Sequence, residues 1–414
     1  LAKVGDMSKA FFIADVHSGN HGGFAGSYQV GLNWRARRIL QIIREAAALA
    51  GQDRGGLYIA GDLFNSHEPA PQVIAATIAA LKDYDWLACD EDADAGPLSR
   101  LHHEPSLVGI LRGNHDANST VPGDDALGPL VYIDGFEVID KVVQYQFADC
   151  PHRGPEQWNI DIDGCILGLM VPFQPGKPDE WLPEVLKAHP IVERGIKVLV
   201  THFGIADGNT PGDMADKAIH IDVLRSLCIE HGFRYVFSGD WHTRRKWEFP
   251  ECTIVQVGAL VPTGFNNPGL DGYGSVWSLS PEGLELHELP GPRFVPLATL
   301  TQARETLDRW RVERPAVATE LFVSLTVPLD QFDEAKELLD AAKAELVIDG
   351  YSLELRRDEA LQAAGEVRAE AARPQRFDEA LRETVQSMTL PPGVSVDAVL
   401  DRAEYVMKAA KPKG

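Results

Sequence analysis

The stretch Leu107–Asp116, which reads Leu-Val-Gly-Ile-Leu-Arg-Gly-Asn-His-Asp, indicates the fold of this protein more clearly than any other. Its first half, Leu107–Leu111, is a short apolar run of the kind that forms a buried β-strand. Polar residues follow this run at once. Because ligands of open α/β sheets bind just beyond the carboxyl ends of the strands, this order indicates a functional site at a strand end.

Two similar apolar runs lie upstream, and each also ends in polar residues: Ala10–Ala14 before Asp15-Val16-His17, and Leu57–Ala60 before Gly61-Asp62. Between the runs, Trp34–Ala50 and the segment from Pro71 carry apolar residues at helical spacing. Strand, helix and strand in alternation predict βαβ units and a parallel sheet, and therefore an α/β fold.

Two more strands of this kind are predicted downstream: Ile196–Val200 before Thr201-His202, and Tyr235–Ser238 before Gly239-Asp240-Trp241-His242. A helix is expected at Ile221–Glu230. Trp158–Asp161 and Cys165–Val171, separated by Asp163-Gly164, are typical of a hairpin. The short β-like segments of Lys246–Leu289, separated by Gly and Pro, favour a second, more antiparallel sheet.

The chain is expected to divide near Pro290-Gly291-Pro292, with a large domain at residues 1–292, a linker at 293–318 and a small α+β unit at 319–414. The elements expected in the small unit are strands at Glu320–Val327 and Tyr351–Leu355 and helices at Asp333–Leu346, Arg376–Met388 and Val396–Lys408.

The charge of the chain limits the class of protein. Its 414 residues include 39 Lys and Arg against 61 Asp and Glu, a formal net charge of −22. This argues against a protein that coats nucleic acid through a general basic surface, but not against a local site whose positive charge comes from metal ions. Six of the acids lie in Asp83–Asp94, which we expect to be a solvated loop.

The five cysteines, at positions 89, 150, 165, 228 and 252, form no Cys-x-x-Cys pair, so we expect mostly buried, reduced thiols. No apolar run approaches the roughly 20 residues of a membrane span, and the first residues lack the pattern of a signal peptide. These features favour a cytoplasmic protein with no membrane association.

The polar residues at the predicted strand ends are of types that bind metals. Asp15, Asp62, Asn114 and His202 come from four different strands, which core packing does not explain. Carboxylate, imidazole and amide oxygen together suit a divalent transition metal. The sequence therefore predicts a metal site at the carboxyl edge of the sheet.

The ordered set of motifs resembles that of the calcineurin-like metallophosphoesterases, whose signature reads DxH, GDxx, GNHD/E, a lone His and GHxH. The matching residues here are Asp15-Val16-His17, Gly61-Asp62-Leu63-Phe64, Gly113-Asn114-His115-Asp116, His202 and Gly239-Asp240-Trp241-His242. The resemblance implies a four-layer α/β/β/α sandwich and the hydrolysis of phosphoesters by water activated by two metal ions.

The resemblance also implies roles for these residues. One metal would be held by Asp15, His17, Asp62 and His242, and the other by Asp62, Asn114, His202 and Asp240. His115 would be the acid that protonates the leaving oxygen. Asp116 would either orient His115 or cap the turn, and we favour the cap. We expect Mn²⁺ at both sites, with Mg²⁺, Fe²⁺ and Zn²⁺ as alternatives.

One residue departs from the signature, because Asp240 stands where the family usually has His. A carboxylate still binds a hard or borderline divalent cation and adds negative charge. We therefore expect the second metal site to persist with a preference for Mn²⁺ or Mg²⁺, although its loss is the competing interpretation.

Within this superfamily the chain most resembles the SbcD-type DNA repair and recombination nucleases. Asp15-Val16-His17-Ser18-Gly19 is similar to their DxHLG motif, and Gly61-Asp62-Leu63-Phe64 is followed by a Pro-containing turn and a helix, as in those enzymes. The resemblance implies a DNA exonuclease or endonuclease, a homodimer, an SbcC-type ATPase partner and a C-terminal unit that shapes the DNA groove.

Local basic residues give this hypothesis modest support. Arg244 and Arg245 follow His242 and would hold phosphates of the substrate, unless they belong to a solvated face. Arg112 precedes the GNHD motif, as in protein Ser/Thr phosphatases, where it helps to hold phosphate. Trp241 would either stack on a base or pack on the sheet.

Two alternatives to a DNA nuclease stay open: a phosphodiesterase or phosphatase for nucleotides or another small phosphoester, and a non-catalytic assembly subunit.

Overall fold

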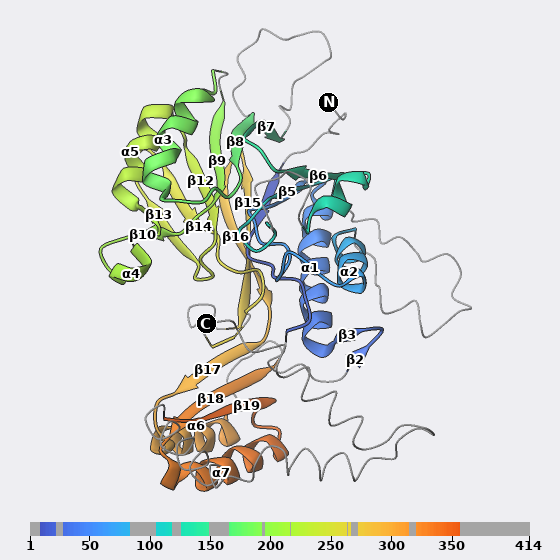
Figure 1. Cartoon of the computed structure of the whole chain (residues 1–414), viewed down its shortest axis with the longest axis vertical. Coiled ribbons are helices and arrows are strands. Elements are labelled where there is room, and N and C mark those ends of the chain that lie inside the picture. Colours follow the sequence, from blue (N-terminus) through green and yellow to red (C-terminus); the bar gives the residue numbers. More distant parts are fainter. Residues whose placement is uncertain are drawn as a thin grey trace, which may run out of the picture.

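The structure, a computed structural model, describes residues 9–21, 28–82, 105–117, 126–148, 165–192, 195–215, 217–262, 264–265, 272–313 and 320–356. Figure 1 shows a large domain, in which helices lie on both outer sides of a central pair of sheets, and a smaller unit at its lower end. The predicted loop Asp83–Asp94 lies outside the described residues.

The first sheet has six strands in the order β16-β15-β1-β4-β5-β6. Its strands are β1 (Ala10–Ile13), β4 (Gly56–Ile59), β5 (Leu107–Leu111), β6 (Phe136–Ile139), β15 (Tyr273–Ser280) and β16 (Gly283–Pro290). The strands β1, β4, β5 and β6 are parallel, which confirms the parallel arrangement predicted for the first three of them, with a helix between each successive pair of those three. β15 pairs antiparallel with β1 and extends the sheet.

The second sheet also has six strands, in the order β13-β14-β12-β9-β8-β7. Its strands are β7 (Val143–Ala148), β8 (Ile166–Val171), β9 (Ile196–His202), β12 (Tyr235–Gly239), β13 (Arg245–Glu248) and β14 (Thr253–Gln256). The inner strands β8, β9, β12 and β14 are parallel, whereas β7 and β13 pair antiparallel at the two edges.

Two predictions about strand pairing need correction. β8 is a strand, but among the described residues its antiparallel partner is β7; the predicted hairpin partner Trp158–Asp161 lies outside the described residues. The segment Lys246–Leu289 does not form a sheet of its own. β13 and β14 join the second sheet, while β15 and β16 join the first, so the chain crosses between the two sheets here.

The layers follow from the alternation of side chains along the strands. Phe11 and Ile13 of β1 pack with α1 (Trp34–Gln52) and α2 (Pro71–Leu81), whereas Phe12 packs against the second sheet. On the far side, α3 (Pro178–Ala188) and α5 (Ile221–His231) cover the second sheet. The order helix, sheet, sheet, helix confirms the four-layer α/β/β/α sandwich (Figure 1).

Shorter elements line the loops around the sandwich. They are β2 (Tyr28–Gln29), β3 (Leu32–Asn33), the 3-10 helix η1 (Gly128–Tyr132), β10 (Ile205–Ala206), α4 (Gly212–Ala215) and β11 (Ile219–His220). β2 and β3 form a small antiparallel pair just before α1.

The C-terminal unit begins earlier than predicted. Its elements are β17 (Arg293–Leu297), α6 (Leu300–Val312), β18 (Leu321–Val327), the 3-10 helix η3 (Leu329–Gln331), α7 (Phe332–Ala344) and β19 (Gly350–Leu355). β17 and α6 occupy most of the expected linker 293–318, because both share the apolar core of this unit. Its three strands are parallel, so the described part is a βαβαβ unit rather than a mixed α+β one. The predicted helices Arg376–Met388 and Val396–Lys408 lie outside the described residues.

The C-terminal unit packs against the first turn of α1. The rings of Trp34 and Phe322 lie 5.9 Å apart, and the Arg35 guanidinium lies 5.3 Å from the centre of the Phe294 ring. Arg38 Nε is 3.6 Å from a carboxylate oxygen of Glu320. Apolar and charged contacts therefore join the two parts of the molecule at this turn.

The cysteines differ from expectation at one position. Cys165 is disulfide-bonded, whereas Cys228 and Cys252 are free and buried. The prediction of a reduced thiol is therefore wrong for Cys165.

None of the helices in the described part of the chain combines the length and apolar character that crossing a bilayer requires.

Candidate metal centre

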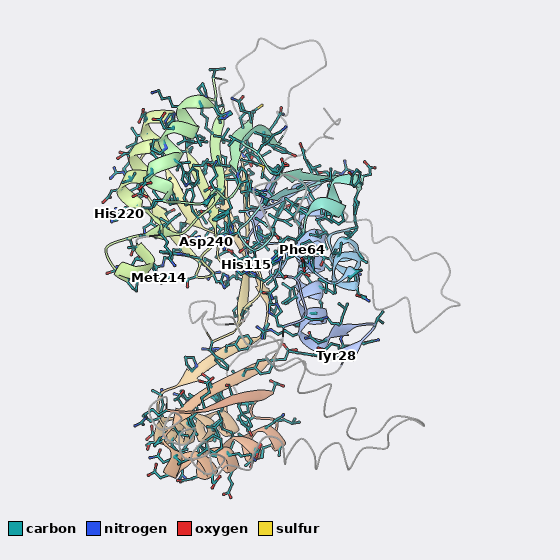
Figure 2. All side chains as sticks on the ribbon, viewed as in Figure 1. Tyr28, Phe64, His115, Met214, His220 and Asp240 are labelled. Carbon is teal, nitrogen blue, oxygen red and sulfur yellow. The ribbon has the colours of Figure 1, made fainter. Side chains whose placement is uncertain are left out.

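The polar residues predicted at the strand ends do lie together. Asp15 and Asp62 follow β1 and β4 of the first sheet, Asn114 follows β5, and His202 ends β9 of the second sheet. Asp240 and His242 follow β12. Figure 2 shows the labelled His115 and Asp240 in the middle of the large domain, where the two sheets meet. The parallel strands of both sheets thus present their carboxyl ends to one region.

Three groups of side chains at this place have ligand atoms within 4.8 Å of one another. They are Asp15, His17 and His242; His17, Asp62 and His115; and Asp15, Asp62 and His202. Asp15, His17 and Asp62 each belong to two of the groups. The two carboxylate oxygens of Asp62 face different histidines: Oδ2 lies 3.8 Å from Nε2 of His17, and Oδ1 lies 3.3 Å from Nε2 of His202, as expected of a bridging carboxylate. All the members except His115 and His242 are buried.

The distances between ligand atoms are short. Nε2 of His17 and Nε2 of His242 lie 2.9 Å apart. Nε2 of His202 lies 2.8 Å from the side-chain amide of Asn114 and 3.3 Å from Oδ1 of Asp62. Nδ1 of His202 donates a hydrogen bond to the Ala60 carbonyl at 2.8 Å, which leaves Nε2 directed at Asp62 and Asn114. Such a bond to the other ring nitrogen is typical of metal-binding histidines.

A buried carboxylate oxygen suggests that the centre takes cations. Oδ2 of Asp15 is buried and has no hydrogen-bond partner among the described residues. Buried polar atoms are nearly always paired in folded proteins, so this atom calls for an explanation. A divalent cation bound by Oδ2 of Asp15 and by Nε2 of His17 would supply it, and carboxylate and imidazole are suitable donors for such an ion. The residues present therefore fit the implied metals.

The pKa values report the electrostatic balance of the centre. Burial raises the pKa of Asp15 well above its usual value and lowers the pKa of His17 to about 3. Burial also opposes charge on His202 and Asp62. Their mutual attraction outweighs it, raising the pKa of His202 to about 10 and holding the pKa of Asp62 well below its usual value. One imidazolium thus stabilises one carboxylate, and further positive charge is needed to stabilise Asp15 as a carboxylate.

The backbone at the centre is held in an unfavourable conformation. Asp15, His17, Asp62 and Asp240 all have positive φ angles, between 48° and 78°, which side-chain-bearing residues seldom adopt. Such residues persist where their surroundings hold them, and they cluster at functional sites. The backbone N–H groups of Asp15 and His17 donate to the carbonyls of Gly61 and Asp62, at 3.2 and 3.0 Å, so the first two motif loops hold each other.

Gly113 allows the third motif to approach the second. A Cβ atom at this position would lie 2.1 Å from Oδ1 and 2.3 Å from the backbone nitrogen of Asp62. No side chain fits in that space, so the glycine of the GNHD motif is required by close packing against Asp62.

Asp116 connects the loop of the third motif to the loop of the second motif. Its buried carboxylate accepts hydrogen bonds from the backbone N–H groups of Gly113 (3.1 Å), Leu63 (3.3 Å) and Phe64 (2.9 Å). Burial and the nearby charge of Asp62 raise its pKa to about 7. These contacts match the predicted capping role, and no hydrogen bond from Asp116 to the His115 ring is found among the described residues.

His115 lies at the rim of the centre. Its backbone N–H donates to Oδ1 of Asp62 at 2.9 Å, and its exposed ring stands nearly perpendicular to that of His17, with centres 4.9 Å apart. The ring therefore borders both the ligand cluster and solvent, which is where a group that meets a substrate must lie.

Asp240 lies at the centre, but its role as a ligand stays a prediction. Its backbone N–H donates to Oδ1 of Asp15 at 2.9 Å, and its charge raises the pKa of both Asp15 and His202. Its carboxylate belongs to none of the three ligand groups among the described residues.

Two of the three arginines predicted to hold phosphate form ion pairs with acidic side chains. Arg244 pairs with Glu288 at 2.6 Å, and Arg245 with Asp207 at 3.3 Å. Arg112 is half-buried at the end of β5, beside the GNHD motif. Trp241 packs closely over Gly204, where an added Cβ would lie 2.2 Å from the indole ring, so the packing interpretation is favoured.

Sequence reasoning did not identify two groups of residues around the centre. Phe173 lies beside His202, with ring centres 6.4 Å apart, and its backbone N–H donates to the Arg112 carbonyl. His21 donates a hydrogen bond to the backbone carbonyl of His17 in the first motif, and Asn33 donates one to the backbone carbonyl of His21. Neither group belongs to a recognisable motif, and loop residues give no periodic signal.

The comparisons with known proteins agree with this architecture. The family model described as calcineurin-like phosphoesterase matches residues 8–244. No curated protein matches the chain. Among solved structures, the protein TT1561 of Thermus thermophilus is similar at 12% identity, with 67% of this chain and 98% of that chain covered and a TM-score of 0.35.

Two other solved structures are similar to a comparable degree. A dimetal phosphatase from Danio rerio is 11% identical, with 69% of this chain and 96% of that chain covered and a TM-score of 0.38. An archaeal phosphodiesterase is 11% identical, with 68% and 99% covered and a TM-score of 0.32. The family match spans more than half of the chain, and the protein therefore belongs to the calcineurin-like phosphoesterases, a family of hydrolases that typically bind two divalent metal ions.

Proposed function

We propose that this phosphoesterase is a two-metal phosphodiesterase that cleaves DNA, as SbcD-type nucleases do. The observation that carries the proposal is the convergence of Asp15, His17, Asp62, His202 and His242 from both sheets, with Asn114 beside them. The DNA assignment rests on the sequence of the first two motif loops, Asp15–Gly19 and Gly61–Phe64, which resemble those of SbcD-type enzymes.

The ligand assignment follows the resemblance and the geometry. Asp15, His17, Asp62 and His242 would hold one cation, and Asp62, Asn114, His202 and Asp240 the other. When bound, the two cations would lower the pKa of water and offset the negative charge of the phosphoryl group. We assign Mn²⁺ to both positions. Oxygen donors predominate at the position of Asp62, Asn114, His202 and Asp240, and at the other position two carboxylates accompany the imidazoles of His17 and His242.

The side chains of the protein would then carry out the remaining steps. His115, exposed at the rim, would donate a proton to the oxygen that leaves phosphorus. Its backbone bond to Asp62 keeps its distance from the ligands constant. Arg112, at the end of β5, would face the phosphate oxygens. Asp116 has no part in the chemistry and holds the two motif loops in register.

A second candidate function is that of a phosphodiesterase or phosphatase acting on nucleotides or another small phosphoester, and one observation favours it. Arg244 and Arg245 are paired with Glu288 and Asp207, so neither guanidinium is committed to a substrate. With a net charge of −22, the chain offers little basic surface to hold a long anionic polymer. A non-catalytic assembly subunit is the weaker alternative, since its ligand cluster would serve no purpose.

Paired assays would decide between these functions. Purified protein with Mn²⁺ should degrade linear duplex or single-stranded DNA, EDTA should stop the reaction, and Asp62→Asn should be inactive on every substrate. Intact DNA beside rapid hydrolysis of bis(p-nitrophenyl) phosphate or of the monoester p-nitrophenyl phosphate would favour the small-substrate enzyme. No hydrolysis of any of these substrates would favour the assembly subunit. A homodimer, an SbcC-type ATPase partner and a cytoplasmic location belong to the nuclease proposal and need separate binding and fractionation experiments.

A further inference from the structure

The backbone of the metal ligand His17 is held from both sides. Its φ angle is +49°, in the left-handed region that a histidine adopts only under constraint. Its N–H donates to the Asp62 carbonyl at 3.0 Å. Its carbonyl accepts a hydrogen bond from Nε2 of His21 at 2.8 Å. Since a carbonyl cannot donate, Nε2 of His21 carries the hydrogen. The position of His17 therefore depends on where His21 lies.

His21 is held in turn by Asn33, which is fully buried. Nδ2 of Asn33 donates to the His21 carbonyl at 2.8 Å. Oδ1 of the same amide accepts from the Ala36 N–H at 2.8 Å and caps the N-terminus of α1. The backbone N–H of Asn33 donates to the side chain of Asn20 at 2.9 Å. Both ends of one carboxamide are thus used, one for the helix and one for the loop that leads to His17.

The first turn of α1, which follows Asn33, also contacts the C-terminal unit. Trp34 and Arg35, the next two residues, contact Phe322 and Phe294 of the C-terminal sheet. The support of His17 therefore rests on a helix end that is packed between the catalytic domain and the C-terminal unit.

We propose that His21 and Asn33 are positioning residues that fix the metal ligand His17 through its backbone carbonyl. The inference rests on the proposed function, because it takes His17 as a metal ligand. Partners that orient a metal ligand without touching the metal commonly change metal affinity by roughly 10- to 100-fold when they are removed. His21 and Asn33 act on the backbone of the ligand, so their effect falls on the metal held by His17 and not on the other one.

The substitution Asn33→Asp separates this role from that of the helix cap. Aspartate caps helix N-termini as well as asparagine does, so the Ala36 contact is retained. It lacks the N–H donor, however, and places a carboxylate oxygen against the His21 carbonyl. If Asn33 were purely structural, this change would lower stability and leave both metal affinities unchanged, whereas with a positioning Asn33 it also weakens one metal.

Mn²⁺ titration calorimetry on the full chain is the test. The wild-type protein should bind two ions, and Asn33→Asp should bind one of them roughly 10- to 100-fold more weakly. The matched control is Thr299→Ala, which removes the side-chain cap of α6, bonded to the Gln302 N–H at 3.1 Å, in the C-terminal unit. It should lower the melting temperature and leave both Mn²⁺ affinities unchanged.

A second pair of variants covers the case in which Asn33→Asp does not fold. His21→Phe leaves the helix cap intact and should weaken the same metal, while His21→Gln, which keeps an N–H donor, should restore part of the affinity. If the wild-type protein binds no Mn²⁺, the proposed function fails. If it binds two ions and neither Asn33→Asp nor His21→Phe changes an affinity, the positioning role is overturned and the proposed function stands.

Discussion

Replacing Gly113 with alanine should disable the centre without adding any polar or charged group. The new Cβ would lie 2.1 Å from Oδ1 of Asp62, and ordinary contact begins near 3.4 Å, so the two must separate by at least 1.3 Å. The backbone nitrogen of Asp62 lies 2.3 Å from the same point, so rotating the side chain is not enough. Asp62 is the proposed bridge, and misplacement of about 1 Å at a reacting centre costs on the order of 100-fold in rate.

We therefore expect kcat/KM for bis(p-nitrophenyl) phosphate to fall by about 100-fold or more in Gly113→Ala. Overpacking of this kind also costs about 1–3 kcal/mol of stability, which thermal unfolding would show. Gly208→Ala is the matched control, because no atom of the described residues lies within 4 Å of the added Cβ and activity should be unchanged. Wild-type activity and metal content in Gly113→Ala would refute the close-packing account of this glycine.

Three further predictions concern single residues of the centre. His115→Ala should keep both metals by elemental analysis and lose phosphodiester cleavage; unchanged cleavage would remove His115 from its assigned role. Asp240→His should shift metal preference from Mn²⁺ toward Zn²⁺ in competition titrations, because imidazole is the softer donor; an unchanged preference would mean that residue 240 is not a ligand. His202 has a pKa raised to about 10 by Asp62, so below that pH it must lose a proton to bind metal. Metal affinity should therefore rise with pH between about 6 and 9, by up to about tenfold per unit, and calorimetry in buffers of different ionisation enthalpy should detect the released proton; its absence would contradict the pairing of His202 with Asp62.

The sequence predicted an α/β fold with a parallel sheet because its strands can be recognised locally, and the family resemblance implied the sandwich. Each inner strand is a short apolar run, and burial on both faces demands that composition whatever the strand pairs with. Pairing is a different matter, since it depends on residues far away in the chain. For this reason β15 and β16 join the first sheet and not the separate antiparallel sheet that the sequence predicts, and β17 is an edge strand of the C-terminal sheet and not part of the predicted linker.

The residues of the centre that belong to motifs could be predicted from the sequence. Asp15, His17, Asp62, Asn114, His202 and His242 could be named because each follows a recognisable strand in a fixed order. The partners of Arg244 and Arg245 could not, because Glu288 and Asp207 have no motif and meet them only through folding. The same reason applies to His21 and Asn33, whose importance lies wholly in what they contact.

The sequence by itself therefore determined the fold class, the order of the polar residues at the strand ends and the chemical types of the ligands. Each of these three can be recognised from short, local segments of the chain. Only the tertiary structure decided how those ends face one another, and the contact at Gly113 is an example. Its need for glycine follows from Asp62, 51 residues away, and no local pattern records that distance. Convergence of side chains from two sheets is a property of packing, and packing is where the proposed metal centre acquires its bridging carboxylate and its supported histidine.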